Sequence, residues 1–362
     1  MIFFFLLVAL GILFSIGYQM ARYRLLWKKT QMPVWIYWVI QGGMMANFFV
    51  MQFQPTLIAN EALANILMCI GAIYFMFMLY GGLLCIVFEV VIYFTKKASW
   101  RYKGMTLILV GTLLVGVYGL INMRTARQTA YDVNISEQAG TESMKIVYLS
   151  DAHLGTAVTI SNLENIVEKV NEKKPDIICL GGDFFDHGTR VTTRNETTKC
   201  LRKLKAKYGV YYVEGNHEVY LRIDHASYFK RAGIHVLSDE TVELPNGVFL
   251  AGRKDKSNQP ITISKLLANV PKQSPVVLLS HQPYEMKEAS QCGVSLMLCG
   301  HTHGGQFPLG NIGTSFANDM NYGIVEKGDF HAITSSGIGG WGVPTKFWYK
   351  SEIVTVTARF QK

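Results

Sequence analysis

The sequence has few cysteines and no closely spaced pair of them. None of its six cysteines forms a CxxC motif, which argues against zinc-finger and thioredoxin-like chemistry. Cys179 and Cys299 each end an apolar run, so they are expected to be buried small residues. A disulfide stays open as an alternative for a domain outside the cell. The sequence shows no internal repeat and no low-complexity segment, and therefore no sign of a repeat architecture.

Charged residues are also scarce, at 17% of the chain, whereas 49% of the 362 residues are hydrophobic. With a mean hydropathy of +0.18, the chain is too apolar to be soluble throughout. The apolar excess lies before about residue 123, where short basic loops separate long apolar runs. These loops supply most of the net charge of +9, so the basic balance does not indicate nucleic-acid binding.

Four apolar runs are each near or above the ~20 residues that a membrane-spanning helix needs. They cover residues 2–20, 34–53, 62–94 and 105–123. The first run differs from a cleaved signal peptide, because no basic residue precedes it and a basic cluster follows it at 22–29. We therefore predict a transmembrane region of about four helices over residues 1–123.

Basic loops predict the orientation of this region, since short loops rich in Lys and Arg stay in the cytoplasm. Such loops follow the first and third runs, and the loop between the second and third has no basic residue. The prediction is a multi-pass cell-membrane protein with the rest of the chain on the extracytoplasmic side. Two spans within 62–94 would invert this topology, but no polar loop interrupts that run. Glu89 is expected to snorkel or to pair with Lys96 or Lys97.

A second domain over residues 124–362 alternates short apolar strands with amphipathic helices, which predicts an α/β layered fold. Polar residues follow each strong strand, where ligands bind in open α/β sheets. They are Asp151, His153, Asp183, Asp186, Asn216, His217, His281, His301 and His303. A single Asp or His at such a place is usually a turn former or a helix cap. Five strand ends of the same character indicate one convergent site instead.

The residue types at these strand ends select the chemistry. Carboxylates, one amide and imidazoles, without thiolates, suit Mn²⁺, Fe or Zn²⁺. There are too many such ligand-type residues for a single metal ion to bind. Two divalent ions about 3.5 to 4 Å apart, sharing one carboxylate, would use them and would form a clamp for in-line displacement at phosphorus.

The motifs "DAHLG", "GGDFFD", "GNHE", "SHQP" and "GHTHGGQ", in this order, resemble the signature of the calcineurin-like metallophosphoesterase superfamily. The last motif, with "HAITSSGIGGWGVPTKF" after it, is similar to the membrane-anchored, YkuE-like bacterial branch. The resemblance covers residues 124–362. It implies a four-layer α-β-β-α sandwich, here preceded by the helical transmembrane bundle.

The resemblance also implies a role for each matching residue. The first metal would be held by Asp151, His153 and His303, and the second by Asn216, His281 and His301. Asp183 would bridge the two ions, which activate water for attack on phosphorus. His217 would protonate the leaving group as general acid, oriented by Asp186. A simple turn role before Gly188 is the alternative for Asp186.

The predicted function is a metal-dependent phosphoric ester hydrolase acting on a phosphodiester, phosphomonoester or pyrophosphate of the cell envelope or of a lipid. A lipid-linked sugar-nucleotide pyrophosphatase is the alternative enzyme, and an inactive metal-binding sensor or scaffold is the alternative outside enzymes. The oligomeric state stays open. After the strand "VFLAG", the chain reads "GRKDKSNQP" where the branch often has a Gly-x-Asp-Asp-like turn. Asp255 either fills that place or is solvated.

Overall fold

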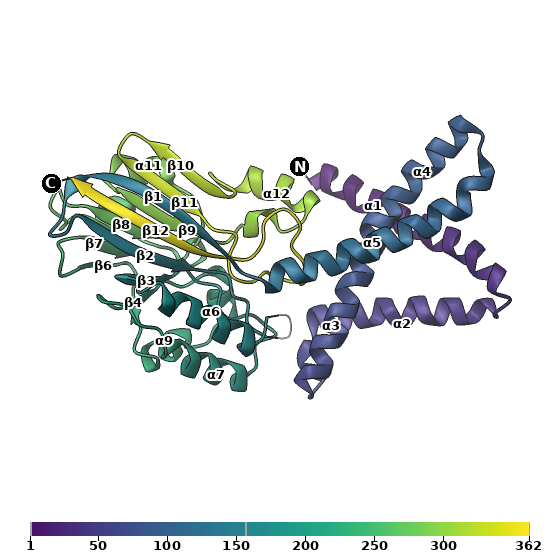
Figure 1. The fold of residues 1–362 in the computed structure, drawn as a ribbon, viewed down its shortest axis with the longest axis horizontal. Coiled ribbons are helices and arrows are strands. Elements are labelled where there is room, and N and C mark those ends of the chain that lie inside the picture. Colours follow the sequence, from purple (N-terminus) through teal and green to yellow (C-terminus); the bar gives the residue numbers. More distant parts are fainter. Residues whose placement is uncertain (1, 156–157, 362) are drawn as a thin grey trace. The chain divides into compact units, whose positions relative to one another are not determined.

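The computed structural model describes residues 2–155 and 158–361 of the chain. The chain forms two compact units, Met1–Leu120 and Ile121–Lys362 (Figure 1). The first unit is helical, and the second contains all the strands that the structure describes.

Long apolar helices make up the first unit. They are α1 (Ile2–Trp27), α2 (Val34–Phe53), α3 (Glu61–Met76), α4 (Gly82–Thr95) and α5 (Arg101–Arg124), with 3-10 turns at Lys28–Thr30, Pro55–Leu57 and Ala98–Trp100. A π-helical turn, Phe77–Gly81, joins α3 to α4, so that Glu61–Thr95 is one helical segment of 35 residues. Within the described residues, three helices are long and apolar enough to cross a membrane: Val34–Phe53, Glu61–Thr95 and Ala98–Arg124.

Glu89 in α4 pairs with arginines, so the expectation that it would pair with Lys96 or Lys97 is wrong. Its carboxylate lies 3.5 Å from Arg22 of α1 and 3.0 Å from Arg101 at the start of α5. Both lysines follow the end of α4, and their ammonium groups lie over the rings of Tyr93 and Trp100. A planar guanidinium also matches a carboxylate better than an ammonium does.

Two six-stranded sheets form the second unit (Figure 1). The first has the order β1-β12-β2-β3-β4-β5, with β1 (Arg127–Gln138), β2 (Ser143–Leu149), β3 (Ile177–Leu180), β4 (Val210–Tyr212), β5 (His235–Val236) and β12 (Glu352–Gln361). The second has the order β10-β11-β9-β8-β7-β6, with β6 (Glu240–Glu243), β7 (Phe249–Gly252), β8 (Val276–Leu279), β9 (Leu296–Cys299), β10 (Gly323–Lys327) and β11 (Phe330–Thr334). Within each sheet, the strands that precede the polar motifs run parallel to their neighbours: β2 with β3 and β4, and β8 with β9.

The hydrophobic core lies between the two sheets. Alternate residues of the strands, such as Ile146, Cys179 and Leu298, point into it. The outer face of the first sheet is covered by α6 (Ile160–Glu172), α7 (Val191–Leu201) and α9 (His225–Arg231) (Figure 1). The outer face of the second packs against α10 (Ile263–Leu266) and α11 (Met286–Gln291). The predicted four-layer α-β-β-α sandwich is confirmed.

Helix α6 illustrates how local sequence positions these layers. Thr159 and Asn162 form a capping box at its start, with the Thr159 side chain accepting from the Asn162 backbone and the Asn162 side chain accepting from the Thr159 backbone. Leu163, Ile166 and Val170 then recur at helical spacing and are buried. The cap and the apolar stripe together fix where the helix begins and which face it turns to the sheet.

Candidate metal centre

The ligand-type residues follow the carboxyl ends of strands from both sheets. Asp151 comes two residues after β2, Asp183 follows β3, and Asn216 begins the short helix α8 (Asn216–Leu221) after β4. From the other sheet, His281 follows β8, and His301 and His303 follow β9. His303 opens a single 3-10 turn, His303–Gly305, that leads to α12 (Pro308–Ala317). The rim of the sandwich therefore gathers side chains from five strand ends.

Several of these residues have left-handed backbone conformations. They are Asp151, His153, Asp183, His301 and His303, with φ between 43° and 70°. Such conformations cost on the order of 1–3 kcal/mol each in a residue other than glycine and are found mostly where function requires them. Backbone hydrogen bonds hold them, for example from Asp151 N to Gly182 O at 2.9 Å and from His153 N to Asp183 O at 2.9 Å.

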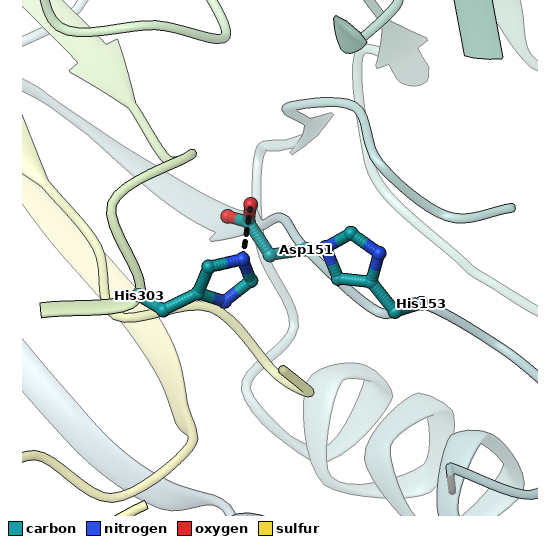
Figure 2. Close-up of side chains that lie close together, drawn as sticks. All are labelled: Asp151, His153 and His303. Atoms are coloured by element: carbon teal, nitrogen blue, oxygen red, sulfur yellow. Dashed lines mark ion pairs between the residues drawn. The ribbon is translucent and has the colours of Figure 1, made fainter. Parts of the chain in front are cut away.

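A first group joins Asp151, His153 and His303, all buried, with ligand atoms within 4.8 Å of one another. Figure 2 shows the imidazole of His303 directed at the Asp151 carboxylate, with Nε2 3.7 Å from Oδ1. The His153 and His303 rings lie 5.0 Å apart, centroid to centroid. The Asp151 carboxylate is also fixed by the His301 backbone N–H, which donates to both of its oxygens at 3.0 and 3.1 Å.

A second group joins Asp183, His281 and His301. His281 Nε2 lies 3.1 Å from Asp183 Oδ2 and 3.1 Å from Asn216 Oδ1, so the amide belongs to the same cluster. The other ring nitrogen, Nδ1, bonds the Gly181 carbonyl at 2.7 Å and orients the imidazole. Asp183 also lies 3.7 Å from His153 Nε2 and thereby links the second group to the first.

A third group joins His153, Asp186 and His217. Asp186 Oδ1 lies 3.0 Å from His217 Nδ1, and Oδ2 lies 3.5 Å from His153 Nδ1. Burial alone would raise the pKa of Asp186, but its interactions with His153 and His217 hold that pKa well below its usual range. Burial opposes charge on His217, yet Asp186 and Asp183 raise its pKa above 6.5. Asp186 also accepts from the His187 backbone N–H at 2.7 Å, so it shapes the turn as well.

The donor set fits metal ions. Both ring nitrogens of His153 and Nδ1 of His303 are buried and form no hydrogen bond within the described part of the chain, which leaves strong donor atoms free for a cation. Burial lowers the pKa of His301 to about 4 and that of His303 well below its usual value, so both imidazoles are neutral, as metal ligation requires. Asp183 raises the pKa of His281 despite the burial of the ring, because its negative charge 3.1 Å away stabilises the protonated imidazole.

Glu218, the last residue of "GNHE", is a supporting residue that the sequence analysis did not single out. Its buried carboxylate accepts the backbone N–H groups of Asp183, Phe184, Phe185 and Gly215 at 2.7–2.9 Å. It thus ties the turn after β3 to the turn after β4. The signal in the sequence was the acidic residue at the third position of the helix that begins within "GNHE", where a carboxylate can cap the helix.

Asp255 is buried rather than solvated. It accepts two hydrogen bonds from Gln282 Nε2, at 3.0 and 2.9 Å, and two from Ser257. Because Gln282 follows His281, Asp255 steadies the turn that carries that imidazole. Although this chain lacks the Gly-x-Asp-Asp-like turn, it therefore still has a carboxylate there, that of Asp255, which is hydrogen-bonded to Gln282.

The four histidines without a predicted role lie outside the three groups. His225 pairs with Glu214 at 3.2 Å, His235 stacks on Tyr211, and His331 Nε2 bonds the Asn134 carbonyl at 2.9 Å. His187 is exposed. Their contacts are those of packing and surface residues.

A sandwich whose rim gathers carboxylates, an amide and imidazoles in this way defines a metal-dependent hydrolase of phosphoric esters. The family model for calcineurin-like phosphoesterases matches residues 144–305. The chain is 32% identical over 260 residues to an uncharacterized metallophosphoesterase of Helicobacter pylori, covering 69% of this chain and 68% of that protein. The chain belongs to the calcineurin-like metallophosphoesterase family.

Other relatives extend this likeness. A zebrafish transmembrane protein with a metallophosphoesterase domain is 30% identical over 285 residues, covering 72% of this chain but only 64% of that protein. The metallophosphoesterase YkuE of Bacillus subtilis is 29% identical over 230 residues, covering 61% of this chain and 80% of that protein. The chain thus spans less than two thirds of the zebrafish protein.

Proposed function

We propose that this chain is a membrane-bound phosphoesterase with two divalent metal ions. Asp151, His153 and His303 would hold the first ion, and Asn216, His281 and His301 the second. Asp183 would bridge them. The observation that carries the proposal is the position of Asp183, which lies within 3.1 Å of His281 in one group and 3.7 Å of His153 in the other. The metal would be Mn²⁺, Fe or Zn²⁺, since the donors are oxygen and imidazole nitrogen.

When bound, the metal ions would lower the pKa of water and neutralise charge on the phosphoryl oxygens. The chain's own contribution is to supply and hold the proton for the leaving group. His217 Nδ1 faces the Asp186 carboxylate at 3.0 Å, which leaves Nε2 to carry a proton toward the substrate. Asp186 raises the pKa of His217 above its ordinary value and so favours the protonated form that donates.

The substrate we propose is a phosphodiester, phosphomonoester or pyrophosphate of the cell envelope, with a lipid-borne phosphoester favoured. We also propose a multi-pass topology with an extracytoplasmic catalytic domain, and such tethering would raise the effective concentration of substrates in the same membrane. A lipid-linked sugar-nucleotide pyrophosphatase would use the same metal groups.

The test is hydrolysis of a chromogenic phosphodiester and of the matching monoester by the detergent-purified protein, metal-free and with added Mn²⁺. We expect turnover that requires metal and is lost in Asp183→Asn. Asp132→Asn, an exposed carboxylate paired with Arg359 at 3.0 Å, is the control and keeps full activity. Metal binding without turnover of any ester or pyrophosphate would favour a sensor or scaffold instead.

A further inference from the structure

The end of helix α5 is hydrogen-bonded to the segment that precedes β12, here called the 335–351 loop. Asn122 Nδ2 donates to the Lys346 carbonyl at 3.3 Å, and the Ser351 backbone N–H donates to the Asn122 carbonyl at 3.2 Å. The Ser351 hydroxyl donates to the Met123 carbonyl at 2.6 Å. Asn122 and Met123 are both buried. The last turn of a helix long and apolar enough to cross a membrane is therefore fixed to this loop.

The same loop supports the metal centre. Backbone N–H groups of Ile338 and Gly339 donate to the carbonyls of Ser150 and Asp151 at 2.8 and 2.9 Å. Gln306, three residues after His303, donates from Nε2 to the carbonyls of Trp341 and Val343 and accepts the Trp341 backbone N–H. Hydrogen bonds thus connect the loop both to the helix end and to the segments that carry Asp151 and His303.

Exposed apolar side chains gather on segments that leave this rim. Trp341 and Trp348 of the loop are 54% and 62% exposed, and Phe316 of α12 is 89% exposed. Tyr220, 55% exposed, lies 6.1 Å from the His217 ring, and Trp341 lies 5.7 Å from it. Other large apolar side chains exposed in the described part of the second unit are Ile121 at the end of α5, Val191 at the start of α7, Ile261 before α10 and Val325 on β10. Trp and Tyr are the side chains that favour the headgroup layer of a bilayer.

Only Thr125 and Ala126 separate the end of α5 from the start of β1. A spanning helix ends near the bilayer surface, so a loop bonded to its last turn has no linker with which to move away from that surface. Lys350, which is exposed and follows Trp348 by two residues, suits the phosphates of a headgroup layer.

We infer that the 335–351 loop rests in the bilayer surface, with Trp341 and Trp348 in the headgroup layer, and that the metal centre takes its phosphoester from a lipid in that surface. The choice of substrate rests on the proposed function, whereas the contact with the bilayer does not. Soluble phosphoesters would reach the same metal centre without help from these side chains.

The contact is tested by spin labels on the full-length protein in nanodiscs of phosphatidylethanolamine and phosphatidylglycerol. The label replaces Trp348 through Trp348→Cys, with Cys69 and Cys292, the two cysteines that are not buried, changed to alanine. The control label, at Asp329→Cys, lies in the exposed turn between β10 and β11, just before β11 and so opposite its rim end. We expect the label at 348 to be relaxed by lipid-soluble oxygen and the label at 329 by a water-soluble nickel chelate. Equal access of the chelate to both labels overturns the inference.

The substrate is tested with two 4-nitrophenyl phosphodiesters that share the reacting bond, one of glycerol and one of diacylglycerol in the same nanodiscs. We expect Trp348→Ala to lower kcat/KM about tenfold for the diacylglycerol ester, the equivalent of one interfacial side chain, and to leave the glycerol ester unchanged. Val325→Ala, the control, changes neither. An equal loss on both esters, or no loss on the lipid ester, overturns the inference. Failure of the wild-type protein to hydrolyse either ester contradicts the proposed function, while the spin labels still decide the bilayer contact.

Discussion

Replacement of Asp186 by asparagine tests the proton-donor pair directly. The change removes the negative charge 3.0 Å from His217 Nδ1 but keeps an oxygen that accepts a hydrogen bond. A hydrogen bond to a charged group contributes about 1.5–3 kcal/mol, and we take roughly half of it because the amide still accepts and Asp186 is partly exposed. About 1.4 kcal/mol corresponds to one pKa unit. We therefore expect the pKa of His217 to fall by about one unit.

The pH dependence follows from the protonated form of His217 being the active one. Its pKa is raised above the ordinary value of a histidine, so the rate for a substrate with an alkyl leaving group extends to higher pH than an unperturbed imidazole would allow and falls as pH rises through that pKa. In Asp186→Asn, this fall moves to lower pH by about one unit, so the rate drops about tenfold at pH values above both pKa values and less at lower pH. A nitrophenyl leaving group, which needs little protonation, loses much less.

The assay is the pH profile of kcat/KM for the alkyl and nitrophenyl substrates, with metal content measured on each sample because Asp186 also lies 3.5 Å from His153. Glu326→Gln is the matched control, since it removes a carboxylate 3.7 Å from His331, outside the metal centre. An unmoved profile and an unchanged ratio between the two substrates in Asp186→Asn, at full metal content, would refute the orienting role.

The remaining predictions concern the proton donor His217, the residues that support the metal centre, and the cysteines of the chain. His217→Ala should reduce turnover of alkyl esters by about 10²–10⁴ while metal content stays intact; loss of metal instead would make His217 a ligand. Gly337→Ala should weaken metal binding in calorimetry, because a Cβ there would lie 2.5 Å from Asp151 Cβ, whereas Gly247→Ala, at a similar φ but with nothing within 4 Å, should bind normally. Glu218→Gln should lower the free energy of unfolding by about 2–4 kcal/mol, because one oxygen cannot accept four backbone N–H groups, and Glu164→Gln on the surface should not; equal unfolding of the two would contradict this. Thiol titration of the unfolded protein without reductant should find six free cysteines, and a lower number would mean that a disulfide forms.

Much of the fold was predictable because strand and ligand motif coincide in this sequence. "MKIVYLSD" and "VSLMLCGHTHGG" are apolar runs that end in polar turns, and they became β2 and β9 with Asp151 and His301 at their ends. The chain's two-sheet arrangement came from the family resemblance, because an apolar run of four residues does not specify which sheet it joins.

Other features depended on long-range contacts that a sequence pattern does not contain. The pairing of Glu89 with Arg22 and Arg101 required the packing of three helices against one another. The hydrogen bonds that join Asn122 to Ser351 and Lys346 connect residues far apart in the chain. The local sequences "INMR" and "KSEIV" contain no pattern that predicts them. Helix α7 contains several threonines, which have modest helix propensity, and its burial against neighbouring helices is not visible in the local sequence.

The pairing of β1 with β12 has a consequence for synthesis. Strand β1 begins directly after the last apolar helix, but its partner β12 is the last strand of the sheet to be made, and β12 also fills the place beside β2. During translation, β1 and β2 each expose an unpaired edge until nearly the whole second unit has left the ribosome. The first sheet is therefore completed only after β12 has been made, and a truncated chain that lacks β12 should be captured by chaperones or degraded rather than retain a partly formed metal centre.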